Sequence, residues 1–293
     1  MTASEYDAPI SPLAGLGVAI LAVSTSAILV RWSSAPSLVK AFYRVLFTVG
    51  LLAPVAFVRH RDALERISRR DMVAASGAGV ALAAHFASWF ESLNHTTVAA
   101  SVTLVQAQPL FVAVGAWAFL DERVSRRTTV GIGIALAGMI VMSLSDLLTA
   151  SGAPRPLFGN ALAVVGAVTA AAYVLTGRSV RRRVALVPYV VVVYSVCALA
   201  LLVVAVARGD PLSGYPTSEW LLFLGMAIGP GIFGHTVINW ALAHLESSVV
   251  SVSLLGEPVG STILALFLLG EIPTLPTILG GAVVLAGIYV TAS

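Results

Sequence analysis

Long apolar runs, separated by short stretches that carry charges, Pro or Gly, dominate this chain. A membrane-spanning helix needs about 20 mainly apolar residues. The segments that meet this condition are 11–31, 37–57, 71–93, 96–120, 128–148, 157–177, 185–206, 219–241, 246–269 and 274–291. The pattern therefore predicts an all-α integral membrane protein with ten transmembrane helices, short connections and no extramembrane domain.

Composition agrees with this reading and excludes several classes of protein. Of 293 residues, 58% are hydrophobic and 11% are charged, whereas a soluble domain carries about 25% charged residues. The pI of about 9.3 reflects a net charge of only +3, with the arginines in short clusters between apolar runs, so nucleic acid is not a predicted partner. A lone Cys197 inside an apolar run excludes a disulfide scaffold and a Cys-rich metal site. No cofactor or metal is predicted, and the expected partners are the lipid bilayer and a small-molecule substrate.

The arginines predict the orientation in the membrane, because cytoplasmic loops carry an excess of Lys and Arg. If both termini share one side, three loops on that side hold Arg59, Arg61, Arg66, Arg69, Arg70, Arg123, Arg126, Arg127, Arg178, Arg181, Arg182 and Arg183. The opposite side holds Arg31, Arg155 and Arg208. We expect a multi-pass protein of the cell membrane with both termini in the cytoplasm. Residues 1–10 form a cytoplasmic tail without the basic start of a signal peptide.

The chain also repeats itself. A shift of 149 residues places Gln108-Pro109 on Glu257-Pro258 and Gly138 on Gly287, and a shift of 150 places His85 on His235. Each repeat contains an odd number of helices, five, so the second must insert upside down relative to the first. The predicted units are a first repeat over 11–148, an external linker over 149–156 and an inverted second repeat over 157–293. Inverted repeats around a midplane site are the architecture of many secondary transporters.

Two stretches, from Pro109 to Gly138 and from Pro258 to Gly287, share the spacing P-x12-E-x8-G-x6-G. Both resemble the paired EamA-type domains of the drug/metabolite transporter superfamily, as does Arg44 early in the second helix. The resemblance implies a ten-helix bundle with a central cavity that exports small metabolites, often amino acids. The YddG-like amino acid exporters are one branch with this layout. The shared motifs do not specify the substrate.

Polar residues at membrane depth give the candidate site, since ionisable groups there are costly and usually functional. Glu257 and Gln108 lie at the midpoints of their helices, each directly before a Pro that opens the helical hydrogen-bond ladder. Glu257 can hold a substrate ammonium or carry a coupling proton; the alternative is a protonated Glu257 that only fixes helix packing. The predicted cavity residues on these two helices are Glu257, Gln108, Ser101 and Ser261, with Pro109 and Pro258 as hinges.

Two histidines related by the repeat extend the candidate set. His85 shares a helix face with Trp89, and His235 with Asn239. Each histidine can pass a proton or can simply donate to a neighbouring carbonyl. Trp89 can stack on a ligand. Gly229 and Pro230 interrupt the helix of His235 and are a predicted hinge.

Arg44 completes the set, with Tyr43 beside it and Tyr173 as a source of a cavity hydroxyl. Arg44 can receive a substrate carboxylate, or it can pair with Glu91 and lock two helices. We expect a secondary transporter that exports small metabolites such as amino acids by alternating access. An alternative is proton-coupled efflux of lipophilic cations, which would rely on Glu257 and aromatic stacking. An intramembrane enzyme is disfavoured, because one active site gives no reason to duplicate the bundle upside down.

Overall fold

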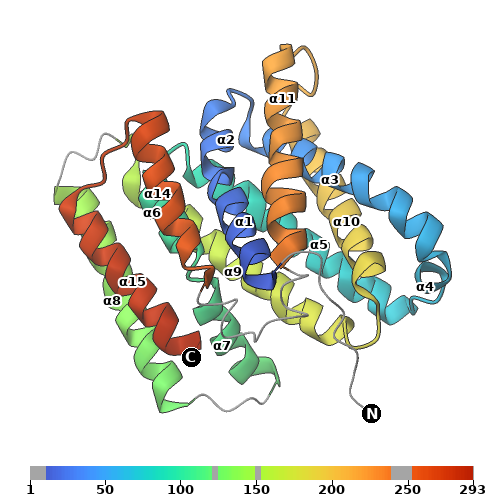
Figure 1. Ribbon diagram of the computed structural model, residues 1–293, viewed down its shortest axis with the longest axis horizontal. Helices are drawn as coiled ribbons and strands as arrows, with labels where there is room; N and C mark the ends of the chain where they lie inside the picture. The colour runs from blue at the N-terminus through green and yellow to red at the C-terminus, as the bar shows by residue number, and fades with distance from the viewer. Residues whose placement is uncertain (1–10, 121–124, 149–152, 239–252, 293) are drawn as a thin grey trace.

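The computed structural model describes all residues except 1–10, 121–124, 149–152, 239–252 and 293. Over the described residues the chain is helical and contains no strand, which confirms the all-α expectation (Figure 1). Six described stretches are long and apolar enough to cross a membrane, namely Pro12–Trp32, Ser37–Arg59, Arg69–Ser92, Val98–Ala118, Pro156–Val180 and Leu186–Ala207. Their ends lie within three residues of the sequence-based bounds.

The elements, in chain order, are α1 (Pro12–Ser24), α2 (Ser26–Trp32), α3 (Ser37–Arg59), α4 (Arg61–Glu65), α5 (Arg69–Ser92), α6 (Val98–Val105), α7 (Gln108–Leu120), α8 (Arg126–Leu148), α9 (Pro156–Val180), α10 (Leu186–Ala207), α11 (Thr217–Met226), the π-helix η1 (Ala227–Thr236), α14 (Gly256–Leu269) and α15 (Leu275–Ala292). Local chemistry explains several ends. The Ser68 side chain caps α5 by accepting from the Asp71 amide at 3.1 Å, and Gly270 ends α14 at a left-handed φ of 68° that glycine adopts readily.

Three predicted helices are interrupted, the last of them (246–269) at a turn over Leu254 and Leu255, and a fourth changes its winding. The first breaks at Thr25, whose hydroxyl donates to the Ala22 carbonyl at 2.7 Å. The segment 96–120 breaks between Val105 and Gln108, so that Pro109 occupies the first turn of α7, where its missing N–H costs nothing. Around Pro230 the chain does not break; it continues as a π-helix, which relieves the clash of the proline ring. The length of an apolar run in the sequence does not reveal such an interruption within it.

Helices of the first half of the chain pack in pairs with helices of the second half. α3 packs on α10, α6 on α14 and α8 on α15, while α5 packs on α9 and α1 packs on η1. The α8–α15 pair forms one side of the bundle, and α3, α5 and α10 form the other (Figure 1). Most membrane crossings therefore contact helices from the other half of the chain.

The two ends of the bundle differ in their polar contacts. At one end the loops 59–71 and 180–186 meet, and the Arg183 guanidinium donates two hydrogen bonds to Asp71, at 3.0 and 2.6 Å. At the other end Glu219 accepts from the Ser33 hydroxyl at 2.5 Å, and Arg31 pairs with Glu271. Two of the three arginine-rich loops predicted to share a side therefore meet at one end; most of the connection between α7 and α8 lies outside the described residues.

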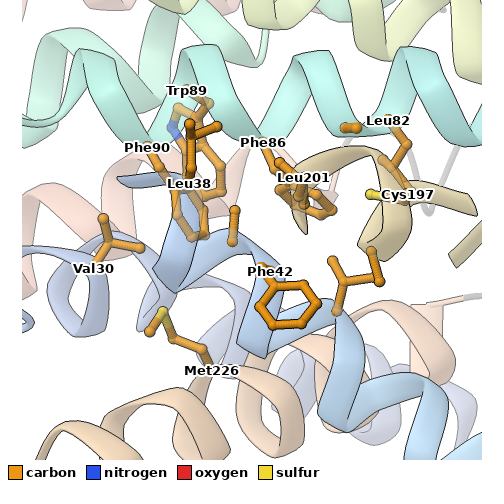
Figure 2. Packing of buried hydrophobic residues seen from close by; sticks show 14 of the residues in the cluster. Val30, Leu38, Phe42, Leu82, Phe86, Trp89, Phe90, Cys197, Leu201 and Met226 are labelled. Atoms are coloured by element: carbon orange, nitrogen blue, oxygen red, sulfur yellow. The ribbon is translucent and has the colours of Figure 1, made fainter. Parts of the chain in front are cut away.

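A hydrophobic core joins α3, α5, α10 and α11. Figure 2 shows Phe86 and Phe90 projecting from α5 toward α3, which carries Leu38 and Phe42, with Trp89 beside them on α5. Phe90 is fully buried, and Phe42 is 8% exposed. The Phe86 and Phe90 rings of this aromatic layer lie beside the buried Arg44 guanidinium, with centroids 4.6 and 5.7 Å from its central carbon.

Candidate functional site

Glu257 lies in the first turn of α14, at the point where the chain re-enters a helix after the turn at Leu254 and Leu255. Its carboxylate accepts a hydrogen bond from the Gln106 amide at 2.6 Å. Gln106 itself lies in the turn that separates α6 from α7. The two residues predicted at helix midpoints, Gln108 and Glu257, lie instead in the first turns of α7 and α14, and the glutamine that contacts Glu257 is Gln106, two residues before Gln108.

Small residues allow α14 to approach α1 next to Glu257. The Ser261 hydroxyl donates to the Ser24 carbonyl at 3.0 Å, and a Cβ placed on Gly260 would lie 2.4 Å from the Ser24 hydroxyl oxygen. Ser101, on α6, is fully buried and shares a 2.5 Å hydrogen bond with Ser92. Ser261 and Ser101 therefore hold helices together in this structure.

Arg44 is the buried cation of the site, with 3% of its surface exposed. One guanidinium nitrogen donates to the Ser26 hydroxyl at 3.0 Å, and the guanidinium carbon lies 4.6 Å from the centre of the Phe86 ring. A guanidinium has five N–H donors; among the described residues, Arg44 directs one to a hydrogen-bond acceptor and forms no ion pair. Glu91, a predicted partner, instead pairs with His95 at 3.1 Å.

His85 and Trp89 share a face of α5, as their spacing predicts. The His85 Nδ1 atom is hydrogen-bonded to the Gly166 carbonyl on α9 at 2.9 Å, and the two rings stack with centroids 5.8 Å apart. The indole N–H of Trp89 is buried and has no hydrogen-bond partner among the residues that the structure describes. A buried N–H without a partner is unfavourable, so Trp89 offers a donor to any acceptor that enters here.

The other predicted residues lie in different surroundings. Tyr43 donates to the Leu212 carbonyl at 2.6 Å and stacks on Phe223, so it belongs to an aromatic cluster at the Glu219 end. Tyr173, half-buried, packs against the core around Cys197. His235 lies at the end of η1 and is exposed. Gly229 and Pro230 lie within η1, Pro258 lies within the first turn of α14, and Asn239 is outside the described residues.

The arrangement places a buried cation, Arg44, and a half-buried carboxylate, Glu257, in the bundle without joining them. Arg44, from the first half of the chain, donates to Ser26, and Glu257, from the second half, accepts from Gln106, so each forms its hydrogen bond with a neutral side chain. Separated charges in a low-dielectric interior are costly unless a partner compensates them. A molecule that carries both a cationic and an anionic group would compensate both.

Comparisons with known proteins agree with this architecture. A protein named "Uncharacterized transporter" from Archaeoglobus fulgidus is 26% identical over 259 residues, covering 86% of each chain. A second transporter of that name and organism is 28% identical over 268 residues, covering 85% of this chain and 92% of its own length. A crystal structure at 21% identity superposes with a TM-score of 0.64 over 96% of both chains, which supports the fold.

The family comparison covers nearly the whole chain. The model of the EamA-like transporter family matches twice, over residues 11–144 and 157–293. The two matches correspond to the two halves that share the internal repeat. This chain is a membrane protein that belongs to the EamA-like transporter family.

Proposed function

We propose that this protein is a secondary transporter of the cell membrane that exports small zwitterionic metabolites, such as amino acids, by alternating access. The observation that carries the proposal is the unpaired placement of Arg44 and Glu257. The guanidinium is matched to a substrate carboxylate, because its planar fork can hold two oxygens at once. The Glu257 carboxylate is matched to a substrate ammonium.

Alternating access requires two similar halves that exchange conformations. The proposed architecture is ten transmembrane helices in two inverted five-helix repeats around a central cavity, with both termini cytoplasmic. Reciprocal contacts between α8 and α15 support it. A Cβ on Gly131 would lie 2.7 Å from the Gly287 carbonyl, and a Cβ on Gly138 would lie 2.7 Å from the Gly280 carbonyl. Because the internal shift relates Gly131 to Gly280 and Gly138 to Gly287, each contact is the symmetry equivalent of the other, as at a two-fold interface.

The larger contact pattern supports the same architecture. Under the internal shifts, the packing of α5 on α9 corresponds to the packing of η1 on α1, and α3–α10 corresponds to itself. Helix interruptions beside Gln106 and Glu257 add the irregular backbone that membrane proteins tolerate where it lines a site. We propose that Gln106 joins the predicted site and that Gln108 plays a smaller part.

Proton-coupled efflux of lipophilic cations is a second candidate, favoured by the aromatic layer of Phe86, Trp89 and Phe90 around the site. Arg44 argues against it, because a buried guanidinium repels a cationic ligand. The two proposals differ in what Arg44 does. For a zwitterion it is a binding group, and for a cation it is an obstacle.

The test is efflux from cells that express the protein and are loaded with dipeptides, with the released amino acids quantified and resistance to lipophilic cations measured in parallel. The proposal predicts faster efflux of at least one amino acid in wild-type cells and strongly reduced, still measurable efflux with Arg44→Gln. Cation resistance that survives Arg44→Gln, without any amino acid efflux in wild-type cells, would establish the second candidate instead.

A further inference from the structure

A pocket of about 460 Å³ lies at the arginine-rich end of the bundle, remote from the Arg44–Glu257 site. It is formed by the end of α3, by α4 and by the loop before α10. Its charged lining consists of four arginines and one carboxylate: Arg59, Arg61, Arg66, Arg183 and Asp62. The pocket is thus predominantly cationic.

Two of these arginines are already neutralised within the protein. Arg61 pairs with Glu65 at 2.9 Å, and Arg183 donates two hydrogen bonds to Asp71. Arg59 and Arg66 form no ion pair with any residue that the structure describes, and both are exposed. Two guanidinium groups therefore face one pocket without an anion to bind.

The apolar surface beside the pocket identifies the kind of anion. Val58 lines the pocket and is 82% exposed, and Phe57 in the same last turn of α3 is 61% exposed. Because α3 is one of the helices long and apolar enough to cross the membrane, its last turn is placed where acyl chains meet headgroups. A ligand that fits must be anionic at one end and apolar at the other.

We propose that this pocket binds the phosphate of an anionic phospholipid from the surrounding leaflet, with Arg59 and Arg66 as its ligands. Guanidinium groups bind phosphate oxygens in pairs of parallel hydrogen bonds. Basic pockets of this kind between membrane helices on the cytoplasmic side are suited to acidic headgroups. The acyl chains then lie along Phe57 and Val58.

The experiment titrates phosphatidylglycerol into the purified full-length protein in a neutral detergent and measures bound lipid by native mass spectrometry. Phosphatidylcholine is the neutral comparison lipid, and glycerol 3-phosphate and inorganic phosphate are added as soluble competitors. Arg59→Gln/Arg66→Gln removes the two proposed ligands. Arg69→Gln/Arg70→Gln is the matched control, because it removes the same charge from the next helix without touching the pocket lining.

We expect phosphatidylglycerol to bind wild-type protein about tenfold more tightly than phosphatidylcholine does, and R59Q/R66Q to remove about that tenfold advantage. The R69Q/R70Q control should change affinity by less than about threefold, since it leaves both proposed phosphate ligands in place and exposed charges outside the pocket are partly screened. If R59Q/R66Q cannot be purified, R59K/R66K keeps the charge but loses the fork geometry and should still weaken binding. Equal losses in both glutamine pairs would mean diffuse attraction and overturn the proposal, as would displacement of the lipid by either soluble phosphate.

Discussion

Arg44 and Glu257, the two charged residues of the site, differ in how the surrounding structure supports their side chains. Arg44 lies inside α3, a continuous helix of 23 residues, and its guanidinium is fixed between Ser26 and the Phe86 ring. Glu257 lies in the first turn of α14 and is hydrogen-bonded to Gln106, a residue that itself lies between two helices. We infer that the cation is held on a rigid support and the carboxylate on an adjustable one. A transporter that must bind and release its substrate needs such an adjustable side.

The largest expected effect comes from removing the fixed cation. Arg44→Gln should lower amino acid efflux by about thirtyfold to a hundredfold, because hydrogen bonds to charged groups contribute about 1.5–3 kcal/mol each and the substrate carboxylate loses its partner. Arg44→Lys should recover little of this loss, since an ammonium group cannot present two parallel donors. Initial efflux rates at equal expression measure both.

Arg208→Gln is the matched control for this change, because it removes a guanidinium from an exposed position after α10. It should leave efflux within about twofold of wild type, as surface ion pairs contribute little. Equal losses for Arg44→Gln and Arg208→Gln would show that net charge, rather than the buried site, controls transport.

The adjustable side depends on the tight α8–α15 pair, against which α6 and α7 pack. Gly138→Ala should lower the free energy of unfolding by about 1–3 kcal/mol through overpacking, because the new Cβ would lie 2.7 Å from the Gly280 carbonyl and from the Val284 amide nitrogen. Gly133→Ala on the same helix meets nothing within 4 Å and should be neutral or stabilising. Thermal unfolding in detergent compares them, and equal midpoints would contradict the close approach.

A sharper test separates the two glutamines of the adjustable side. Gln106→Leu should lower efflux by about tenfold, since it removes the hydrogen bond that positions the Glu257 carboxylate. Gln108→Leu makes the same chemical change two residues away and should cost less than about threefold. A larger loss for Gln108→Leu than for Gln106→Leu would contradict a role for the Gln106–Glu257 hydrogen bond. It would indicate instead that Gln108, the residue that the internal repeat aligns with Glu257, is the functional glutamine.

The smallest expected effect is on stability and comes from Tyr43, which anchors α3, the helix that carries Arg44. Tyr43→Phe removes the hydrogen bond to the Leu212 carbonyl but keeps the stacking on Phe223. The free energy of unfolding should fall by about 1 kcal/mol, while the substrate concentration for half-maximal efflux stays unchanged. A change in that concentration with no loss of stability would indicate that Tyr43 contacts the substrate and would contradict its purely structural role.

These contrasts also separate what the sequence could predict from what it could not. The apolar runs place α3, α5, α9 and α10 within three residues of their observed ends, because a bilayer fixes helix length and composition directly. The rarity of charge at membrane depth likewise selects Glu257 and Arg44. The choice between Gln106 and Gln108 was beyond the sequence, since it depends on the helix break before α7, which changes the direction in which each side chain points.

The partners of the aromatic residues were also hidden from sequence reasoning. Tyr43 and Arg44 are adjacent in the chain, yet Tyr43 packs on Phe223 while Arg44 lies against Phe86. Neighbouring residues on a helix point about 100° apart, and only packing decides which direction meets the site. For the same reason the sequence did not predict that the Trp89 indole would be buried with no hydrogen-bond partner in the described part of the chain.

The most direct test of the central claim compares three substrates that differ by one charge: an exported amino acid, its amide, which lacks the carboxylate, and its deaminated acid, which lacks the ammonium. Competition for efflux is measured in wild type, Arg44→Gln and Glu257→Gln. Wild type should prefer the amino acid over both analogues. Arg44→Gln should abolish the preference for the amino acid over the amide but keep its preference over the deaminated acid. Glu257→Gln should do the opposite. If both variants retain the wild-type preferences, Arg44 and Glu257 do not bind the two ends of the substrate.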